Sequence, residues 1–178
     1  MSQYIFNNSF LDPVSSADAS VHAAMDGVFY TVTTGSQNVS QASGFFVFQV
    51  TNPANSGKTL HIRSIRAGSF NNVVIDSLRN ATFAAAGTSA TPRNTNYAFP
   101  DASVVTTKYT SSGSDPTTGG TLFQTVQQAG GSTVTFDYDG RVIMESSSTD
   151  QTLFIRLSNT VANSRMAITV SWWEYSNT

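Results

Sequence analysis

From residue 28 to the C-terminus, apolar and polar side chains alternate in short runs that are separated by clusters of Gly, Asn, Ser and Asp. Alternation with a period of two is typical of a β-strand with one buried face, and the intervening residues favour turns. The pattern predicts strands at residues 28–34, 44–51, 58–67, 72–78, 81–86, 103–110, 121–128, 132–139, 141–146, 151–158 and 165–175. Short strands at intervals of roughly 8–12 residues indicate an all-β sandwich or barrel.

We therefore expect one jelly-roll-like antiparallel β-sandwich over residues 28–178, preceded over residues 1–27 by an extended N-terminal arm with a short helix. A jelly roll is favoured over an immunoglobulin-like sandwich, because the chain of 178 residues is long for the latter and has no cysteine. Between the strands we expect a long ordered loop at 87–102, a flexible loop at 111–120 and a hairpin turn at Asp139-Gly140.

Two of the predicted strands carry further information. The run "GFFVFQVT" at 44–51 is nearly apolar on both faces, which is typical of a central strand buried on both sides. In "KTLHIRSIRA" at 58–67, Leu60 and Ile62 share one face, but Ile65 falls on the opposite parity. This phase shift predicts a β-bulge, or a strand that changes sheets, between Arg63 and Arg66.

The N-terminal arm contains an apolar cluster that an ordinary disordered tail lacks. Its members are Tyr4, Ile5, Phe6, Phe10 and Leu11. We expect this cluster to dock either on its own domain or on a neighbouring subunit. Residues 15–27, "SSADASVHAAMDG", predict a helix of about two turns, with Ser15 or Ser16 as the N-cap and Gly27 as the stop. The arm has neither a basic segment nor a long apolar one, so we expect no secretory signal.

Composition supports an all-β fold and narrows the classes of partner. Ser, Thr and Asn make up about a third of the residues, and only 11% are charged, against roughly 25% in ordinary soluble domains. The net charge of -2 argues against a nucleic-acid binder, which normally carries a basic surface. Cysteine is absent, so the chain forms neither disulfides nor thiolate metal sites. No apolar run is long enough for a membrane helix.

The stretch "NPANSGKT" at 52–59 ends like a phosphate-binding loop. That loop requires a glycine five residues before its Gly-Lys pair, where this chain has Asn52, followed by Pro53. It must also open a helix that faces the phosphate, whereas "TLHIRSIRA" alternates like a strand. We interpret the stretch as a hairpin turn between two neighbouring strands.

Other candidate chemistry is sparse. The two histidines, His22 and His61, have no recognisable nucleophile partner, and the only glutamates, Glu145 and Glu174, lie in no acidic cluster. Asp137 and Asp139 are spaced to face the same side of a strand, where they would bind Ca²⁺ or act as half of a glycosidase pair. We favour the alternative that Asp139 belongs to a hairpin turn with Gly140 and that Asp137 is solvated, and we predict no catalytic residue, metal ligand or cofactor.

Aromatic residues are the remaining candidates for a binding surface. Trp172 and Trp173 face opposite sides of the last strand, so we expect one in the core and the other at a sheet edge or the surface. The candidates for contact with a ligand or a neighbouring subunit are Tyr97, Phe99, Trp173 and Tyr175. We expect Tyr97 and Phe99 to fold onto the domain from their loop.

Two stretches, "FQVTNPANSGKTLHIRSI" at 48–65 and "MAITVSWWEY" at 166–175, resemble the small jelly-roll structural proteins of tailed phages and related bacterial surface assemblies. The resemblance implies a non-enzymatic, self-assembling subunit of a virion (a head decoration, tail or fibre protein) or of an extracellular filament. Its expected partners are copies of itself or other structural subunits. The alternative is a carbohydrate- or receptor-binding module that uses the surface aromatics.

Overall fold

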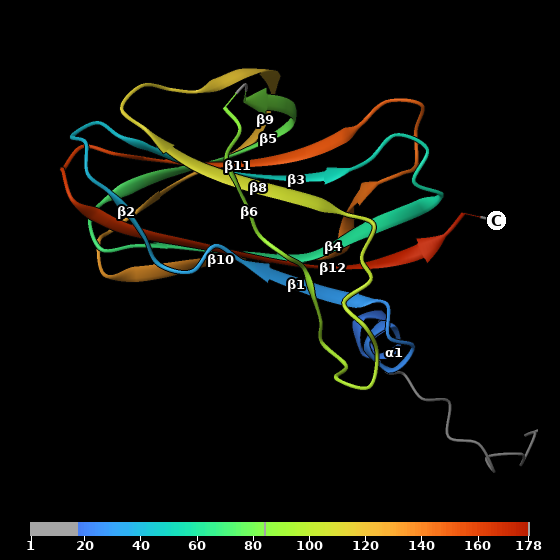
Figure 1. The fold of residues 1–178 in the computed structure, drawn as a ribbon. Helices are drawn as coiled ribbons and strands as arrows, with labels where there is room; N and C mark the ends of the chain where they lie inside the picture. The colour runs from blue at the N-terminus through green and yellow to red at the C-terminus, as the bar shows by residue number, and fades with distance from the viewer. Residues whose placement is uncertain (1–17, 84, 178) are drawn as a thin grey trace, which may run out of the picture.

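The structure is a computed structural model that describes residues 18–83 and 85–177. It contains two stacked antiparallel sheets and one short helix (Figure 1). Sheet A consists of β1 (Phe29–Thr33), β2 (Gln37–Val39), β4 (Lys58–Ser69), β7 (Arg93–Asn94), β10 (Ser132–Met144) and β12 (Ser164–Ser176). Sheet B consists of β3 (Phe45–Asn52), β5 (Val73–Phe83), β6 (Thr88–Ser89), β8 (Thr106–Ser112), β9 (Thr117–Gln128) and β11 (Gln151–Asn159). The predicted all-β sandwich is confirmed.

The strand pairing is nested in the manner of a jelly roll. The strand β1 pairs with β12, β3 with β11, β4 with β10, and β5 with β9, so early strands pair with late ones in order. The order is β10-β4-β12-β1-β7 in sheet A, where β2 also pairs with β12, and β6-β8-β3-β11-β5-β9 in sheet B. This order places β10 and β9 at the same side of the sandwich, each at an end of its sheet.

The main hydrophobic core fills the space between the sheets. Its fully buried side chains alternate along the four central strands: Phe46, Phe48 and Val50 on β3, Leu60, Ile62 and Ile65 on β4, Leu153, Ile155 and Leu157 on β11, and Ile168, Val170 and Trp172 on β12. Each such side chain stabilises the fold by about 1.5–3 kcal/mol relative to exposure. The alternation in the sequence is therefore the direct cause of the sandwich.

A second, smaller core explains why β3 is apolar on both faces. Val47 and Phe154 point to the outer face of sheet B, where they pack with Leu78, Ala81 and Phe83. The last residues of β5 lie over this face because the strand bends at Asn80, whose φ is +55°. The hydroxyl of Thr152 donates to the carbonyl of Ala81 at 2.7 Å and holds the bent end. The predicted burial of β3 on both sides is confirmed.

The predicted bulge is present in β4. Ser64 pairs with Ser171 and Ile62 with Trp172, so Arg63 is an extra residue between them. The bulge lets Ile65 follow Ile62 into the core. The alternative prediction, a strand that changes sheets, is wrong because β4 stays in sheet A.

Several predicted boundaries are wrong, and bulges explain most of them. Residues 72–78 and 81–86 were expected to form two strands, but the bend at Asn80 keeps them in one continuous β5. Asp139 and Gly140 do not form a hairpin turn, because they lie in a bulge within the single strand β10. Only four residues of the predicted flexible loop 111–120 lie between β8 and β9.

The predicted helix is present as α1 (Ala19–Met25), and α1 contacts β1 and β12 of sheet A. Its N-cap is Asp18, whose carboxylate accepts from the backbone N–H of Ser20 at 3.2 Å. The expectation of a serine N-cap is therefore wrong. The arm residues Tyr4, Ile5, Phe6, Phe10 and Leu11 lie outside the described residues.

Candidate functional site

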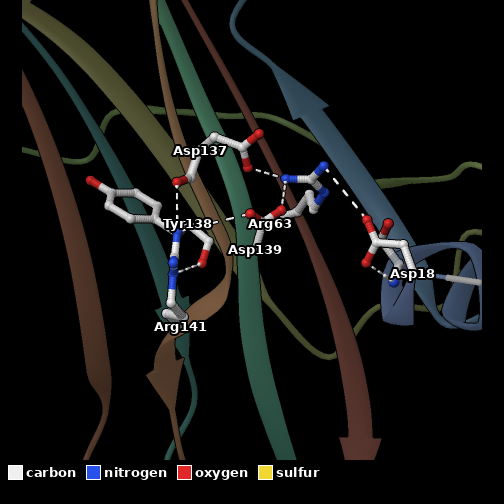
Figure 2. Close-up of polar contacts among 7 residues, drawn as sticks. Asp18, Arg63, Asp137, Tyr138, Asp139 and Arg141 are labelled. Carbon is white, nitrogen blue, oxygen red and sulfur yellow. Dashed lines mark hydrogen bonds and ion pairs between the residues drawn. The ribbon is translucent and has the colours of Figure 1, made fainter. Parts of the chain in front are cut away.

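The two bulges of sheet A bring charged side chains together around Arg63 (Figure 2). Arg63 Nη1 forms ion pairs with Asp137 Oδ1 and Asp139 Oδ1, and Nη2 lies 3.7 Å from Asp18 Oδ2. Arg141 Nε donates to the carbonyl of Tyr138 at 2.9 Å and closes the bulge of β10. The group links β4, β10 and the start of α1 on the outer face of sheet A.

This arrangement gives Asp137 and Asp139 a structural role. Both carboxylates are engaged by Arg63, a cation that competes with any metal ion for their oxygens. The pKa of Asp18 is held below its ordinary value, first by the hydrogen bond from Ser20 and also by Arg63. Among residues 18–83 and 85–177, no group of three His, Cys, Asp or Glu side chains is placed to hold a metal ion.

An aromatic stack lies beside this group, and it corrects the prediction for Trp173. Trp173 is only 3% exposed, with its ring 5.5 Å from His61 and nearly parallel to it, and 6.2 Å from Phe29. Gly140 lies directly against the ring, where a Cβ atom would approach Trp173 to within 2.4 Å. Trp172 is buried on the opposite face, in the core. Both tryptophans are therefore packing residues, because the β10 bulge covers the one that was expected at the surface.

The other predicted aromatics are dispersed. Tyr97 is 99% exposed and contradicts the expectation that it folds onto the domain, whereas the ring of Phe99 packs over Gly27. Tyr175 is partly exposed and contacts His61 edge-on. The Tyr97 loop is held instead by Asp101, which accepts from Arg93 and from the backbone N–H of Asn94; these hydrogen bonds, with that from Arg93 the larger cause, lower the pKa of Asp101.

The Gly57-Lys58-Thr59 stretch is not a phosphate loop. Lys58 opens β4 and not a helix, and its ammonium donates to Ser176 Oγ at 2.9 Å. The prediction of a hairpin is also wrong, because β3 and β4 belong to different sheets. Asn55 and Gly57 both adopt positive φ values, which allow the chain to cross from sheet B to sheet A in five residues.

His61 and Glu174 are held in the packing of the fold, whereas His22 is not. His22 is exposed on α1, and His61 Nδ1 lies 3.2 Å from the carbonyl oxygen of Gly140. Glu174 is 3% exposed and accepts hydrogen bonds from the indole of Trp172 at 2.9 Å, from the hydroxyl of Ser103 and from the backbone N–H of Val104 at 3.3 Å. Its carboxylate joins the last strand to the segment that leads into β8.

The most distinctive surface feature is a groove at the side of the sandwich where β9 and β10 lie. It has a volume of about 510 Å³ and reaches down to the core residues Met144 and Leu153. We call it the β9–β10 groove. Its lining residues are Arg79, Asn80, Thr121, Phe123, Val142, Ile143, Met144, Gln151, Thr152 and Leu153.

The groove exists because the two sheets separate at this side. The bend of β5 at Asn80 carries the β5–β9 ribbon over the outer face of sheet B and away from β10. As a result Phe123 and Ile143, which flank the opening, remain 42% and 50% exposed. Leu122 beside them is 51% exposed.

Both strands at the groove also have an unpaired edge. Within the described part of the chain, β9 pairs only with β5, and β10 pairs only with β4. Strand edges present N–H and C=O groups that favour pairing with another chain. Sequence reasoning missed this surface, although the adjacent apolar pair Leu122-Phe123 breaks the alternation of its strand and was a usable signal.

Comparisons with protein-family models, curated proteins and solved structures found no match to this chain. Within the described residues, no helix is long and apolar enough to cross a membrane.

Proposed function

We propose that the protein is a structural subunit that self-associates through its N-terminal arm and its strand edges. The observation that carries this proposal is the β9–β10 groove, where exposed apolar side chains lie beside two unpaired strand edges. A virion is the proposed setting, as a head decoration, tail or fibre component, with an extracellular filament as the other assembly of this kind.

Strand addition provides the mechanism. A segment from another copy that extends along β10 or β9 gains main-chain hydrogen bonds, which supply affinity without regard to sequence. Side chains such as Phe123 and Ile143 then supply specificity, because they contact only a partner with apolar residues at the matching spacing. The sparse surface charge adds little electrostatic repulsion between copies.

The arrangement of the polar groups supports a structural role over a chemical one. Asp137 and Asp139 are paired with Arg63, and Glu174 with Trp172 and Ser103, so each of these carboxylates serves to join elements of the fold. The alternative of a carbohydrate-binding surface loses one of its candidate aromatics, because Trp173 is buried. Jelly rolls also serve as viral capsid domains, and this analogy of fold agrees with a virion as the setting.

We expect deletion of residues 1–14 to leave a folded domain that no longer assembles. The main core lies entirely between residues 30 and 172, so the deletion removes none of its members. Light scattering coupled to size-exclusion chromatography would report the mass of the particles, and circular dichroism would report the fold. Phe70→Ala is the matched control, because Phe70 is an exposed aromatic that lies outside both the arm and the groove. A truncated chain that assembles like the full chain would exclude the arm as the contact.

A further inference from the structure

We infer that the N-terminal arm of one copy binds in the β9–β10 groove of a second copy, with Asp12 of the arm paired to Arg79 of the groove. This inference rests on the proposed function and adds to it the acceptor site, the register and the partner. The structure supplies the groove, and the amino-acid sequence supplies the chemistry of the arm.

The groove combines an apolar floor with a polar rim. Half of its lining is apolar, from Phe123, Val142, Ile143, Met144 and Leu153. The uncharged polar residues Asn80, Thr121, Gln151 and Thr152 supply hydroxyl and amide groups. A ligand that fits this lining is an extended peptide with apolar side chains, few charges, and polar residues that are hydroxyls or amides.

The arm has this composition. Tyr4, Ile5, Phe6, Phe10 and Leu11 are apolar, and the residues between Phe6 and Phe10 are Asn, Asn and Ser. In an extended strand Tyr4 and Phe6 project to the same face, where both can contact one apolar surface. Burial of such aromatic side chains favours binding.

Charge supplies the register. Arg79 is the only charged residue that lines the groove, it is exposed, and it has no ion-pair partner among the described residues. Asp12 is the only charged side chain among residues 1–17. The one unpaired cation of the groove and the one anion directly after Phe10-Leu11 are opposite in charge, and pairing them aligns the apolar pair with the floor beside Arg79.

The second copy is the occupant that the path of the chain favours. The described chain begins at Asp18 on the outer face of sheet A, and the ion pairs of Arg63, Asp139 and Arg141 extend from there towards β10 (Figure 2). To reach its own groove, the arm would have to cross these groups, pass round β10 and enter between the sheets. Only five residues lie between Asp12 and Asp18, and the six steps from one to the other span about 20 Å when the chain is fully extended. The arm of a neighbouring copy has no such restriction.

Charge reversal in the full chain tests the inference. The single variants Asp12→Arg and Arg79→Asp each place like charges at the contact, so we expect each alone to associate on the order of tenfold more weakly than the unmodified chain. An equimolar mixture of the two variants restores opposite charges in both directions, but only between different copies. We therefore expect the mixture to recover the unmodified affinity, as measured by analytical ultracentrifugation. Arg66→Asp is the matched control, because Arg66 is an exposed arginine outside the groove.

Each other result contradicts a defined part of this account. If both single variants associate like the unmodified chain, Asp12 and Arg79 are not paired and the inference fails, while assembly itself stands. If the mixture stays weak but one chain carrying both substitutions recovers, the arm binds its own domain. If neither the mixture nor that chain recovers, the pairing is absent. An unmodified chain that remains monomeric overturns the proposed function instead.

Discussion

Trp172→Ala is expected to lower the free energy of unfolding by about 3–5 kcal/mol, the range for removal of a large buried aromatic. Trp172 is fully buried between the sheets and is among the largest such side chains of the core. Its indole N–H also donates to Glu174 at 2.9 Å, so the substitution leaves a buried carboxylate with fewer donors. For a domain of this size the midpoint of thermal unfolding should fall on the order of 10 °C.

Tyr97→Ala is the control for this measurement. The Tyr97 side chain is 99% exposed, and substitutions at such positions usually change the free energy of unfolding by less than about 0.5 kcal/mol. Thermal unfolding followed by circular dichroism should separate the two variants clearly. Equal midpoints would mean that Trp172 does not occupy the core position described above.

Gly140→Ala is expected to destabilise the protein by about 2–5 kcal/mol for two separable reasons. The φ of Gly140 is +78°, a conformation that costs an L-residue about 1–2 kcal/mol. The added Cβ would also meet the ring of Trp173 at 2.4 Å, and overpacking of this kind costs about 1–3 kcal/mol. This loss of stability tests whether the β10 bulge covers Trp173.

Gly131→Ala isolates the first reason, so the difference between the two variants measures the second. Gly131 has a φ of +77°, but a Cβ there would meet no atom within 4 Å. In chemical denaturation, Gly131→Ala should lower the free energy of unfolding only by the cost of the backbone conformation. Gly140→Ala should lower it further, by the cost of the contact with Trp173. If both variants lose the same free energy, Trp173 does not pack against Gly140.

The fold was predictable from local patterns because burial itself is periodic. The apolar run at 44–51 predicted a central strand, which packs on both faces. The phase shift within 58–67 predicted a bulge, which is present because Ile62 and Ile65 must each reach the core. Local patterns did not predict which strands pair with one another in a sheet. Strands β3 and β4 lie in different sheets, although the turn residues between them are those of a hairpin.

The site residues were harder to predict, because their exposure depends on distant segments. Trp173 is buried by the bulge of β10, which meets it only in three dimensions. Phe123 and Ile143 are exposed because β5 bends at Asn80, far from both in the sequence. The carboxylates Asp137 and Asp139 were recognised as sharing a face, but their partner Arg63 becomes visible only once β4 and β10 are paired.

The mass of the unmodified chain in solution tests the central claim most directly. We expect light scattering to give a mass above that of one 19.0 kDa chain, with a proportion of assembled species that rises with protein concentration. Electron microscopy of the same sample should show closed oligomers or filaments. A monomeric mass at every concentration, with no particles larger than one chain, would contradict the account.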